Sequence, residues 1–390
     1  MFKFVHITHL DDVRHAISED FFLAERDWGY VINYHINAFP EIKDEMTDEE
    51  KILEHTRREF RGIKFDKLGN LIARPFHKFF NWGEKEAEMA HFDFNQPFVI
   101  MDKLDGSMIH PVLVDDEILW CSKMGPTDVG QQVTAFVADK IDYINFVSDQ
   151  MALGFTPIFE WCSRQQRIVV DYPEDQLILT AIRHNLTGKY VSFGQMASSA
   201  AVYSIPVVKT WKGDFAGIDQ FLAEIGGEEQ CEGYIIRFEN GHMVKLKNAW
   251  YLNLHRAKDQ LRNEKNVYRL VLSEHHDDLL PQLDPDTRKA LEDFAAALSQ
   301  KVKLEASRYE AGVHHASQVW PLRKDFAINF ATKQDLPAVV FKILDGKPAY
   351  DALVDWLLDQ TSTQTKLDAA KAKFGNINWR SYYYPVDMDG

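Results

Sequence analysis

The chain up to about residue 255 consists of short apolar runs separated by charged residues and turn residues. Runs of this kind, bounded by Gly, Asn and Asp, are typical of β-strands, and short hairpin turns join strands that lie antiparallel. Helical spacing of apolar residues appears at 130–151, and Thr47 followed by three acidic residues predicts an earlier helix start. The pattern predicts strands at residues 61–65, 71–75, 98–102, 109–114, 118–123, 155–161, 167–172, 177–183, 232–238 and 243–247.

From about residue 256 onward, apolar residues recur at the spacing of helices. Asp286 stands before a helix with Leu291 and Leu298 on one face. Further helices are predicted at residues 337–345, 350–358 and 366–374. We therefore predict an α+β protein with an antiparallel-sheet domain at residues 1–255 and an all-helical C-terminal domain at residues 256–390.

The chain has 44 Lys and Arg residues against 59 Asp and Glu residues, which gives a net charge of −15. A protein that coats nucleic acid is basic, so this class is disfavoured, whereas an enzyme with a local basic cleft is not. Basic residues on strands usually form solvated faces, but basic and aromatic residues together also bind a triphosphate or an RNA end. Eight basic residues are concentrated in residues 57–85: Arg57, Arg58, Arg61, Lys64, Lys67, Arg74, Lys78 and Lys85.

Cys121, Cys162 and Cys231 are widely spaced, which fits neither a disulfide framework nor a zinc motif and favours a reducing compartment. The first residues lack the apolar segment of a signal peptide, and no stretch of about eighteen apolar residues occurs. We therefore expect a cytoplasmic protein that has no membrane partner.

Lys103 follows an apolar run at residues 98–101 and stands shortly before Asp105-Gly106. Burial disfavours the charged ammonium form, and a neutral lysine is a nucleophile. Lysine nucleophiles form Schiff bases or attack phosphorus. The sequence Lys-Leu-Asp-Gly-Ser at residues 103–107 favours attack on phosphorus, although such a sequence also occurs by chance in hairpins.

Four further charged residues stand on predicted strands beside apolar neighbours: Glu160, Glu232, Lys245 and Lys247. Lys245 and Lys247 are two residues apart, so a strand directs both side chains to one face. The Asn240-Gly241 turn returns them beside the strand that begins at Glu232. Such charges form either a buried ion-pair network or a binding site for an anion.

The order of these residues resembles the motif series of the covalent nucleotidyltransferases, which include DNA ligases, RNA ligases and mRNA capping enzymes. The series is a lysine motif at Lys103, a strand glutamate at Glu160, a Glu-Gly strand at Glu232 and a Lys-x-Lys strand at Lys245. Within this superfamily the chain resembles the RNA ligase 1 family, the tRNA-repair ligases of T-even bacteriophages. The segments that carry the resemblance are residues 59–62, 78–81, 122–123, 167–169, 183–190, 232–234, 245–247 and 250–255.

The resemblance implies an ATP-grasp-like nucleotidyltransferase fold for residues 1–255 and RNA specificity for the C-terminal helices. It implies an ATP-dependent RNA ligase that joins 5′-phosphate and 3′-OH ends through lysyl-AMP and RNA-adenylate intermediates. Lys103 is then the nucleophile. Lys245 and Lys247 hold the α-phosphate, and their positive charges favour the neutral form of Lys103 by repulsion.

The resemblance also assigns residues to roles. The implied catalytic residues are Lys103, Asp105, Glu160, Glu232, Lys245 and Lys247. The implied nucleotide-binding residues are Arg61, Lys78, Phe80, Lys103, Lys123, Glu160, Lys245 and Lys247, with Phe80 either stacking on a base or packing in the core. Asp105, Glu160 and Glu232 are implied to bind the metal, directly or through water.

ATP and Mg²⁺, with Mn²⁺ as a substitute, are the implied cofactors. The implied partner is single-stranded or nicked-loop RNA such as tRNA, bound by a monomer in the cytoplasm, which is the host cytoplasm for a phage-encoded protein. Two other classes stay open at this point. One is a GTP-dependent capping-type enzyme, although no OB-domain motif follows Lys247, and the other is an inactive RNA-binding protein.

Overall fold

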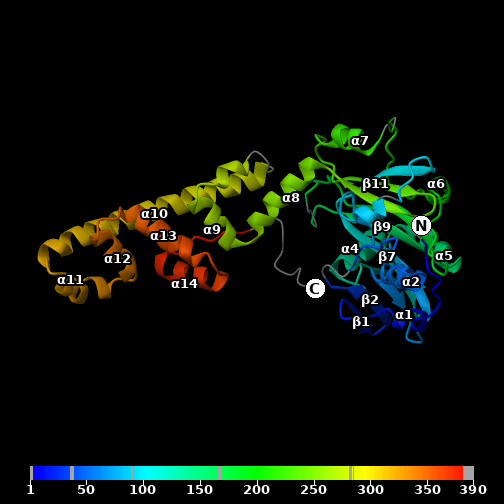
Figure 1. The fold of residues 1–390 in the computed structure, drawn as a ribbon, viewed down its shortest axis with the longest axis horizontal. Coiled ribbons are helices and arrows are strands. Elements are labelled where there is room, and N and C mark those ends of the chain that lie inside the picture. The colour runs from blue at the N-terminus through cyan, green and yellow to red at the C-terminus, as the bar shows by residue number, and fades with distance from the viewer. Residues whose placement is uncertain are drawn as a thin grey trace. The chain divides into compact units, whose positions relative to one another are not determined.

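The computed structural model of the chain describes residues 3–35, 39–89, 91–165, 169–213, 215, 217–280, 283 and 285–380. The chain divides into two compact units, Met1–Leu252 and Asn253–Gly390. All strands of the described residues belong to the first unit, and Figure 1 shows the second unit as a set of helices.

The N-terminal sheet contains four antiparallel strands in the order β1-β2-β3-β4. They are β1 (Phe21–Arg26), β2 (Gly29–Tyr34), β3 (Ile63–Phe65) and β4 (Leu71–Ala73). Two helices, α1 (Asp11–Arg14) and α2 (Asp48–Arg57), belong to the same part of the chain. Thr47 caps α2 through a reciprocal capping box with Glu50, so the predicted helix start is confirmed.

The second sheet has the order β10-β9-β7-β8 and is antiparallel. Its strands are β7 (Ser107–Val114), β8 (Glu117–Cys121), β9 (Phe155–Cys162) and β10 (Gln176–His184). Apolar residues of α4 (Asp128–Val137), α5 (Ile141–Ala152) and α6 (Phe193–Val202) form one buried cluster with this sheet, which includes Phe146, Phe159 and Trp161.

The third sheet has the order β5-β12-β11-β6, in which only the β12–β5 pair is parallel. Its strands are β5 (Phe80–Asn81), β6 (Phe98–Asp102), β11 (Gly233–Phe238) and β12 (Met243–Lys247). Helix α7 (Ile218–Ile225) packs on this sheet, and α3 (Glu86–Met89) follows β5 in the chain. A smaller cluster joins the second and third sheets through Ile158, Ala181 and Met243. The strands that carry the predicted site residues are therefore packed against each other.

Two predicted elements differ in the structure. The single helix predicted at 130–151 is divided into α4 and α5, because Lys140 leaves the helical conformation and its ammonium donates to the carbonyl of Phe136. The strand predicted at 167–172 is wrong for residues 169–172, and residues 167 and 168 lie outside the described part. Val169 and Val170 donate their backbone N–H groups to the carboxylate of Asp105, and not to a neighbouring strand.

In the second unit, the apolar faces of the helices pack against one another. Leu291, Phe294, Leu298 and Val302 are buried along the longest helix, and Asp286 lies in its first turn instead of preceding it. The helices in the described part of this unit are α9 (Glu264–Leu272), α10 (Pro285–Val319), α11 (Arg323–Asn329), α12 (Pro337–Leu344), α13 (Ala349–Gln360) and α14 (Gln364–Phe374), with 3₁₀ turns at His276–Asp278 and Ala331–Lys333. Helix α8 (Ala249–Arg262) contains the division between the units. No helix among the described residues combines the length and the apolar content needed to cross a membrane.

Candidate active site

Lys103 immediately follows β6, and its backbone N–H donates to the carbonyl of Gly233 at 2.8 Å. The hydrogen bonding between β6 and β11 therefore continues one residue beyond the strand. The Lys103 side chain is 19% exposed, and its Nζ lies 2.5 Å from Oε1 of Glu232. This lysine is held at the edge of the core and remains accessible to a substrate.

Glu232 stands directly before β11 and is 5% exposed. Burial raises the pKa of its carboxyl, and the charge of Lys103 opposes this rise. Nζ of Lys247 lies 3.7 Å from the same carboxylate oxygen, because Gly233 pairs with Lys247 across the β11–β12 hairpin. Glu232 thus lies between the two lysines that the sequence placed on separate strands.

Glu160 lies in β9, opposite Met108 of β7. Burial raises the pKa of its carboxyl to about 7. The charge of Lys103 lowers this pKa, and the charge of Glu232 raises it further. The strands approach closely at Gly106, where a Cβ atom would lie 2.3 Å from the carbonyl oxygen of Trp161 and 3.1 Å from Cγ of Glu160. The glycine of the lysine motif therefore permits the backbone packing that brings Glu160 near Lys103.

Asp105 is 2% exposed, and both of its carboxylate oxygens accept hydrogen bonds from the protein. Oδ2 accepts from the backbone N–H groups of Val169 and Val170 at 2.7 Å each, and Oδ1 accepts from the hydroxyl of Tyr251 at 2.8 Å. The backbone N–H of Asp105 donates to the hydroxyl of Tyr172 at 2.9 Å. Asp105 therefore fixes the loop after Lys103, and the sequence analysis gave neither tyrosine a role in the site.

Lys245 and Lys247 occupy the same, half-buried face of β12, as their spacing predicts. Nζ of Lys245 lies 4.6 Å from the ring centre of Phe79, a residue that the sequence did not single out. Burial lowers the pKa of Lys245 to about 6, and the charges of Arg61, Lys103, Lys78 and Lys247 lower it further. The site therefore concentrates positive charge in a way that a bound anion would relieve.

Arg61, Lys78 and Lys123 surround Tyr34 of β2, which is also absent from the predicted site. The Nζ atoms of Lys78 and Lys123 lie 5.2 and 4.8 Å from the centre of the tyrosine ring. Burial by itself would raise the pKa of Tyr34, but the three cations outweigh it and lower that pKa. A group of cations that favours a phenolate is also suited to phosphate. Because Arg61 also acts on Lys245, the two groups of cations adjoin each other.

Phe80 meets this group of charges at Lys78, whose Nζ lies 5.3 Å from its ring centre. It is 8% exposed and packs in the N-terminal core beside Phe39, with the guanidinium of Arg58 at 4.5 Å from its ring centre. The structure thus favours packing over base stacking for Phe80. Among the eight basic residues, Lys64 and Arg74 are fully buried and Arg58 is 3% exposed, so a solvated face is the wrong interpretation for these three.

The carboxylates bear on the metal prediction. No group of three or more His, Cys, Asp or Glu residues within the described ranges is arranged to hold a metal ion. Burial and the charge of Glu232 nevertheless raise the pKa of Glu160, so a divalent cation beside the two carboxylates would lower their mutual repulsion. These two carboxylates fit a metal held through water better than Asp105, whose oxygens are already bonded.

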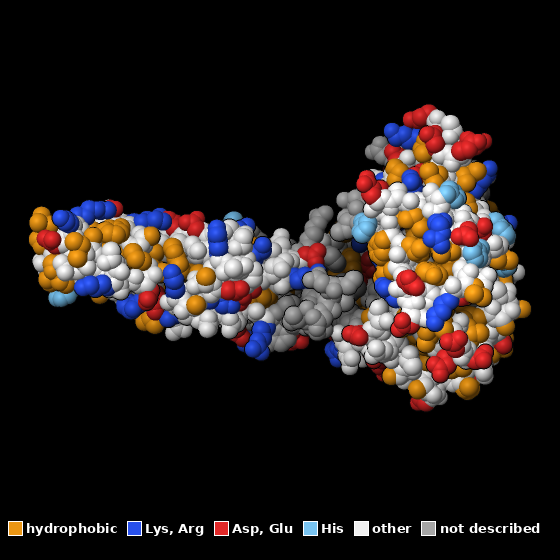
Figure 2. Space-filling model, turned by 90° about the horizontal axis from the view of Figure 1, so that it is seen from below, with side chains coloured by type: hydrophobic (Ala, Val, Ile, Leu, Met, Phe, Trp, Pro, Cys, Tyr) orange, Lys and Arg blue, Asp and Glu red, His pale blue; other side chains and the backbone are white. Residues whose placement is uncertain are grey.

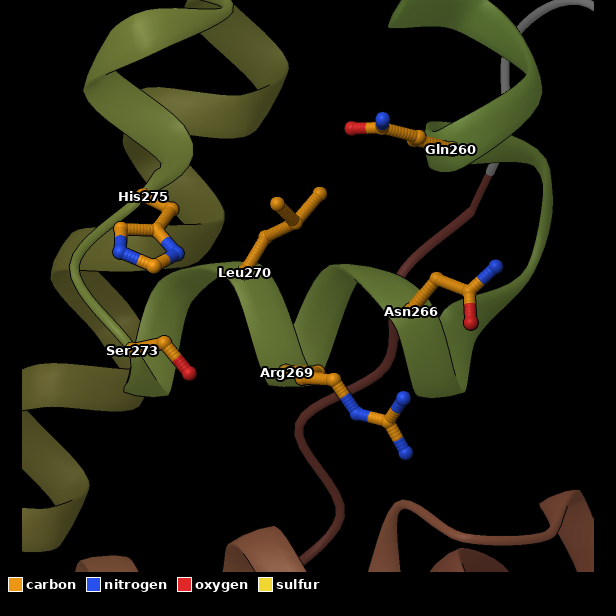
Figure 3. Close-up of a pocket in the computed structure, with 6 residues that line it drawn as sticks. All are labelled: Gln260, Asn266, Arg269, Leu270, Ser273 and His275. Carbon is orange, nitrogen blue, oxygen red and sulfur yellow. The ribbon is translucent and has the colours of Figure 1, made fainter.

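A separate cavity of about 250 Å³ lies in the second unit, lined by Gln260, Asn266, Arg269, Leu270, Ser273 and His275. Figure 3 shows that Arg269 and Leu270 point away from each other and not toward a common centre. The Arg269 guanidinium donates to the side chain and the carbonyl of Thr361, both at 3.2 Å. This cavity therefore lacks the convergent charges that surround Lys103. Figure 2 shows basic and acidic side chains interspersed on the visible face of the same helices.

A lysine paired with a buried glutamate and surrounded by cations defines the class of a phosphate-handling nucleophile. Residues 59–251 match the sequence profile of a family described as RNA ligase. The motif series predicts the RNA ligase 1 family, and this prediction is confirmed for the matched segment, which is just under half of the chain. The matched segment contains every residue that was predicted for the site.

Three relatives illustrate the extent of the similarity. A protein of Thermovibrio ammonificans, named as a candidate RNA ligase, is 28% identical over 232 residues, which are 57% of this chain and 60% of the relative. RNA ligase 1 of bacteriophage TS2126 is 26% identical over 51% of this chain and 52% of its own length. An RNA ligase of Rhodothermus phage RM378 is 24% identical over 81% of this chain and 93% of its own length. The chain therefore spans little more than half the length of the first two relatives.

Solved structures show weaker similarity. An archaeal ATP-dependent RNA ligase has a TM-score of 0.41 at 12% identity, and the match covers 51% of this chain and 54% of that chain. An RNA ligase of Naegleria gruberi with pyrophosphate has a TM-score of 0.35 at 18% identity, over 41% of this chain and 52% of that chain.

Proposed function

We propose that this protein is an ATP-dependent RNA ligase that joins a 5′-phosphate to a 3′-OH through lysyl-AMP and RNA-adenylate intermediates. The observation that carries the proposal is the position of Lys103, whose Nζ lies 2.5 Å from Glu232 and close to Lys247. The match to the RNA ligase 1 family supports the same reaction. The nucleotidyltransferase core, of ATP-grasp-like type, comprises residues 1–255 in this proposal.

In the first step, Nζ of Lys103 attacks the α-phosphorus of ATP, a phosphorus–nitrogen bond forms, and the bond to the pyrophosphate leaving group breaks. The carboxylate of Glu232 is close enough to Nζ to accept the proton that this nitrogen loses. In the second step, the oxygen of an RNA 5′-phosphate displaces Lys103 and takes the AMP group. In the third step, an RNA 3′-OH attacks the 5′-phosphorus and releases AMP.

The cations of the site bind the phosphates in these steps. Lys245 and Lys247 hold the α-phosphate, where charge develops during each transfer. Arg61, Lys78 and Lys123 hold the pyrophosphate leaving group or the RNA phosphate, beside Tyr34. Asp105 keeps the loop that carries Lys103 in place through its bonds to Val169, Val170 and Tyr251.

Glu160 and Glu232 would hold Mg²⁺ or Mn²⁺ in this proposal, directly or through water. The bound ion would supply positive charge that neutralises the phosphate oxygens. Asp105 is the weakest of the three predicted metal ligands, because its oxygens already accept hydrogen bonds from the protein.

The helical residues 256–390 select the RNA in this proposal, with single-stranded or nicked-loop RNA such as tRNA as substrate, a monomer as the active form and the cytoplasm as location. All of the predicted site residues lie before residue 252, which supports this division of roles. A chain that ends at Arg262 and is shown to fold should still take AMP from ATP while it seals RNA poorly. Loss of AMP transfer from such a folded chain would contradict the division.

The proposed function is tested by incubating the protein with α-labelled ATP or α-labelled GTP and Mg²⁺, followed by denaturing electrophoresis. Label from ATP alone, together with sealing of 5′-phosphate RNA, is the expected result. Label from GTP alone would instead support a capping-type enzyme. Absence of label from both nucleotides would contradict covalent nucleotidyl transfer and leave a binding protein.

A further inference from the structure

Lys64 of β3 is a fully buried lysine whose partners are hydrogen-bond acceptors without a formal charge. Its Nζ donates to the carbonyl oxygens of Gly62 and Ser122 at 3.0 Å each and of Lys123 at 3.1 Å. Nε2 of His110 lies 2.9 Å away. No carboxylate within the described ranges pairs with this ammonium, although burying an unpaired charge is costly.

The ammonium of Lys64 has three N–H groups, which are shared among these four acceptors. Burial holds the pKa of His110 well below its usual range, so this imidazole is neutral. Nδ1 of His110 lies 3.3 Å from the carbonyl oxygen of Pro111, which makes Nδ1 the protonated nitrogen and leaves Nε2 to accept from Lys64. Burial lowers the pKa of Lys64 to about 8.

The carbonyls that Lys64 binds belong to two segments far apart in the sequence, and each segment carries a cation of the phosphate site. Gly62 directly follows Arg61, and Ser122 directly precedes Lys123. The two backbones touch, since a Cβ atom at Gly62, whose φ is +89°, would lie 2.4 Å from the carbonyl oxygen of Lys123. Only a glycine permits this approach.

Arg61 and Lys123 repel each other, and Lys78 adds to the same repulsion around Tyr34. No described ion pair joins any of these three cations to a carboxylate. The hydrogen bonds from Lys64 to carbonyl groups of both segments therefore hold these segments together. The charged side chains of Arg61 and Lys123 stay available to a ligand.

We propose that Lys64 is a positioning residue that holds Lys123 against Arg61, so that both cations meet the same phosphate group. The inference rests on the proposed function in taking this ligand as a polyphosphate such as pyrophosphate. Lys64 itself does not touch the ligand, because its ammonium is enclosed by protein acceptors.

The experiment measures the binding of inorganic pyrophosphate by calorimetry to four full-length chains: the wild type, Lys64→Met, Lys123→Ala and the double variant. Methionine keeps the length of the lysine side chain but donates no hydrogen bond. We expect Lys64→Met to weaken binding about tenfold in the wild type, but about threefold or less when Lys123 is already alanine. If Lys64→Met weakens pyrophosphate binding by the same factor with and without the Lys123 side chain, Lys64 has a general structural role and the proposal is overturned.

Two further variants make the test independent of stability. Val112→Ala removes buried apolar atoms from β7, the strand of His110, and leaves the four Lys64 contacts intact, so it should leave pyrophosphate affinity unchanged. Gly62→Ala displaces the backbone contact with Lys123 and leaves the Lys64 side chain in place. Its loss of pyrophosphate affinity should again be smaller when Lys123 is already alanine. This variant tests the proposal even if the Lys64→Met chain does not fold.

The outcome for this inference is separable from the outcome for the proposed function. A wild type that binds no pyrophosphate would overturn the inference, whether or not the protein forms lysyl-AMP. In another outcome, the wild type forms no lysyl-AMP while the effect of Lys64→Met on pyrophosphate affinity still depends on Lys123 as expected. That result would overturn the ligase reaction and support the role of Lys64.

Discussion

Two groups of cations in the first unit each combine residues of the basic stretch 57–85 with a residue from later in the chain, but the groups differ in their counter-charges. In one group, Arg74 and Arg183 are fully buried, with their Nη2 atoms 2.9 and 2.8 Å from Oε1 of Glu59. In the other group, Arg61, Lys78 and Lys123 surround Tyr34, and no described carboxylate pairs with them. The first group has a matched counter-charge, and the second does not.

The pKa values show what this difference means. Burial by itself would raise the pKa of Glu59, but Arg183 and Arg74 outweigh it and lower the pKa to about 2. Burial and the neighbouring cations lower the pKa of Lys245 to about 6, because its surroundings disfavour one more positive charge. A matched group of charges serves the fold, whereas an unmatched group is relieved by an anionic ligand. Removing a charge should therefore affect stability in the first group and activity in the second.

The largest effect is expected at Lys103. Lys103→Ala should abolish AMP attachment and RNA joining, since the nucleophile is lost, and Lys103→Arg should be equally inactive because arginine stays protonated. Both chains should fold, because the alanine variant leaves Lys247 beside Glu232 and removes one repelling charge from Lys245, and the arginine variant keeps the positive charge. Label retained on Lys103→Ala after denaturing electrophoresis would contradict the role of Lys103, and thermal unfolding serves as the control for folding.

Glu59→Ala should destabilise the fold by about 3–5 kcal/mol, because it leaves two buried guanidinium groups unpaired. Since the folded pKa of Glu59 is about 2 and the ordinary value is 4.5, its contribution is complete above pH 4.5 and is lost as the pH falls toward 2. Denaturant unfolding at several pH values measures both effects. The exposed Glu45→Ala is the matched control, and equal stability of the two variants would remove the distinction between the groups.

Lys245→Ala and Lys247→Ala should each slow lysine adenylylation at saturating ATP by about two to three decades, the usual effect of losing one cation or donor on a developing charge. The same variants should slow the sealing of RNA that is supplied already adenylylated. The free energy of unfolding should change little, in contrast to Glu59→Ala. The exposed Lys189→Ala provides a control, and single-turnover rates equal to this control would mean that the pair is only a solvated strand face.

The smallest effect concerns protons. Because the pKa of Lys245 is about 6 in the ligand-free site, this lysine is mostly neutral at pH 7.5 and becomes charged beside a phosphate. ATP binding at pH 7.5 should therefore take up as much as about one proton. ATP affinity should increase as the pH falls from about 8 to 6 and then level off. Calorimetry in buffers of different ionisation enthalpy measures this uptake, which Lys245→Met should abolish and Lys189→Met should not.

The sequence determined the strands that carry Glu160, Lys245 and Lys247 and those that Lys103 and Glu232 adjoin, because alternation and turn residues are encoded within a few neighbouring positions. It also determined that Lys245 and Lys247 share a face, since side chains alternate along any strand. The residue order then indicated the family. At the division of 130–151 into two helices, Lys140 donates to the carbonyl of Phe136, and in the loop at 169–172 two backbone N–H groups donate to Asp105; no periodicity reveals such bonds.

Tertiary structure alone decided which basic residues became buried and which ones face the site. Lys64 binds carbonyls at residues 122 and 123, and Arg74 binds carbonyls at residues 185 and 186, so their partners come from distant strands and loops. The same holds for Tyr34 and Phe79, which become neighbours of the site cations only when the sheets pack. A lysine on a short strand has the same local sequence signal on either face of a sheet. Its burial, its counter-charge and its pKa are set by groups that only the folded chain brings within a few ångströms.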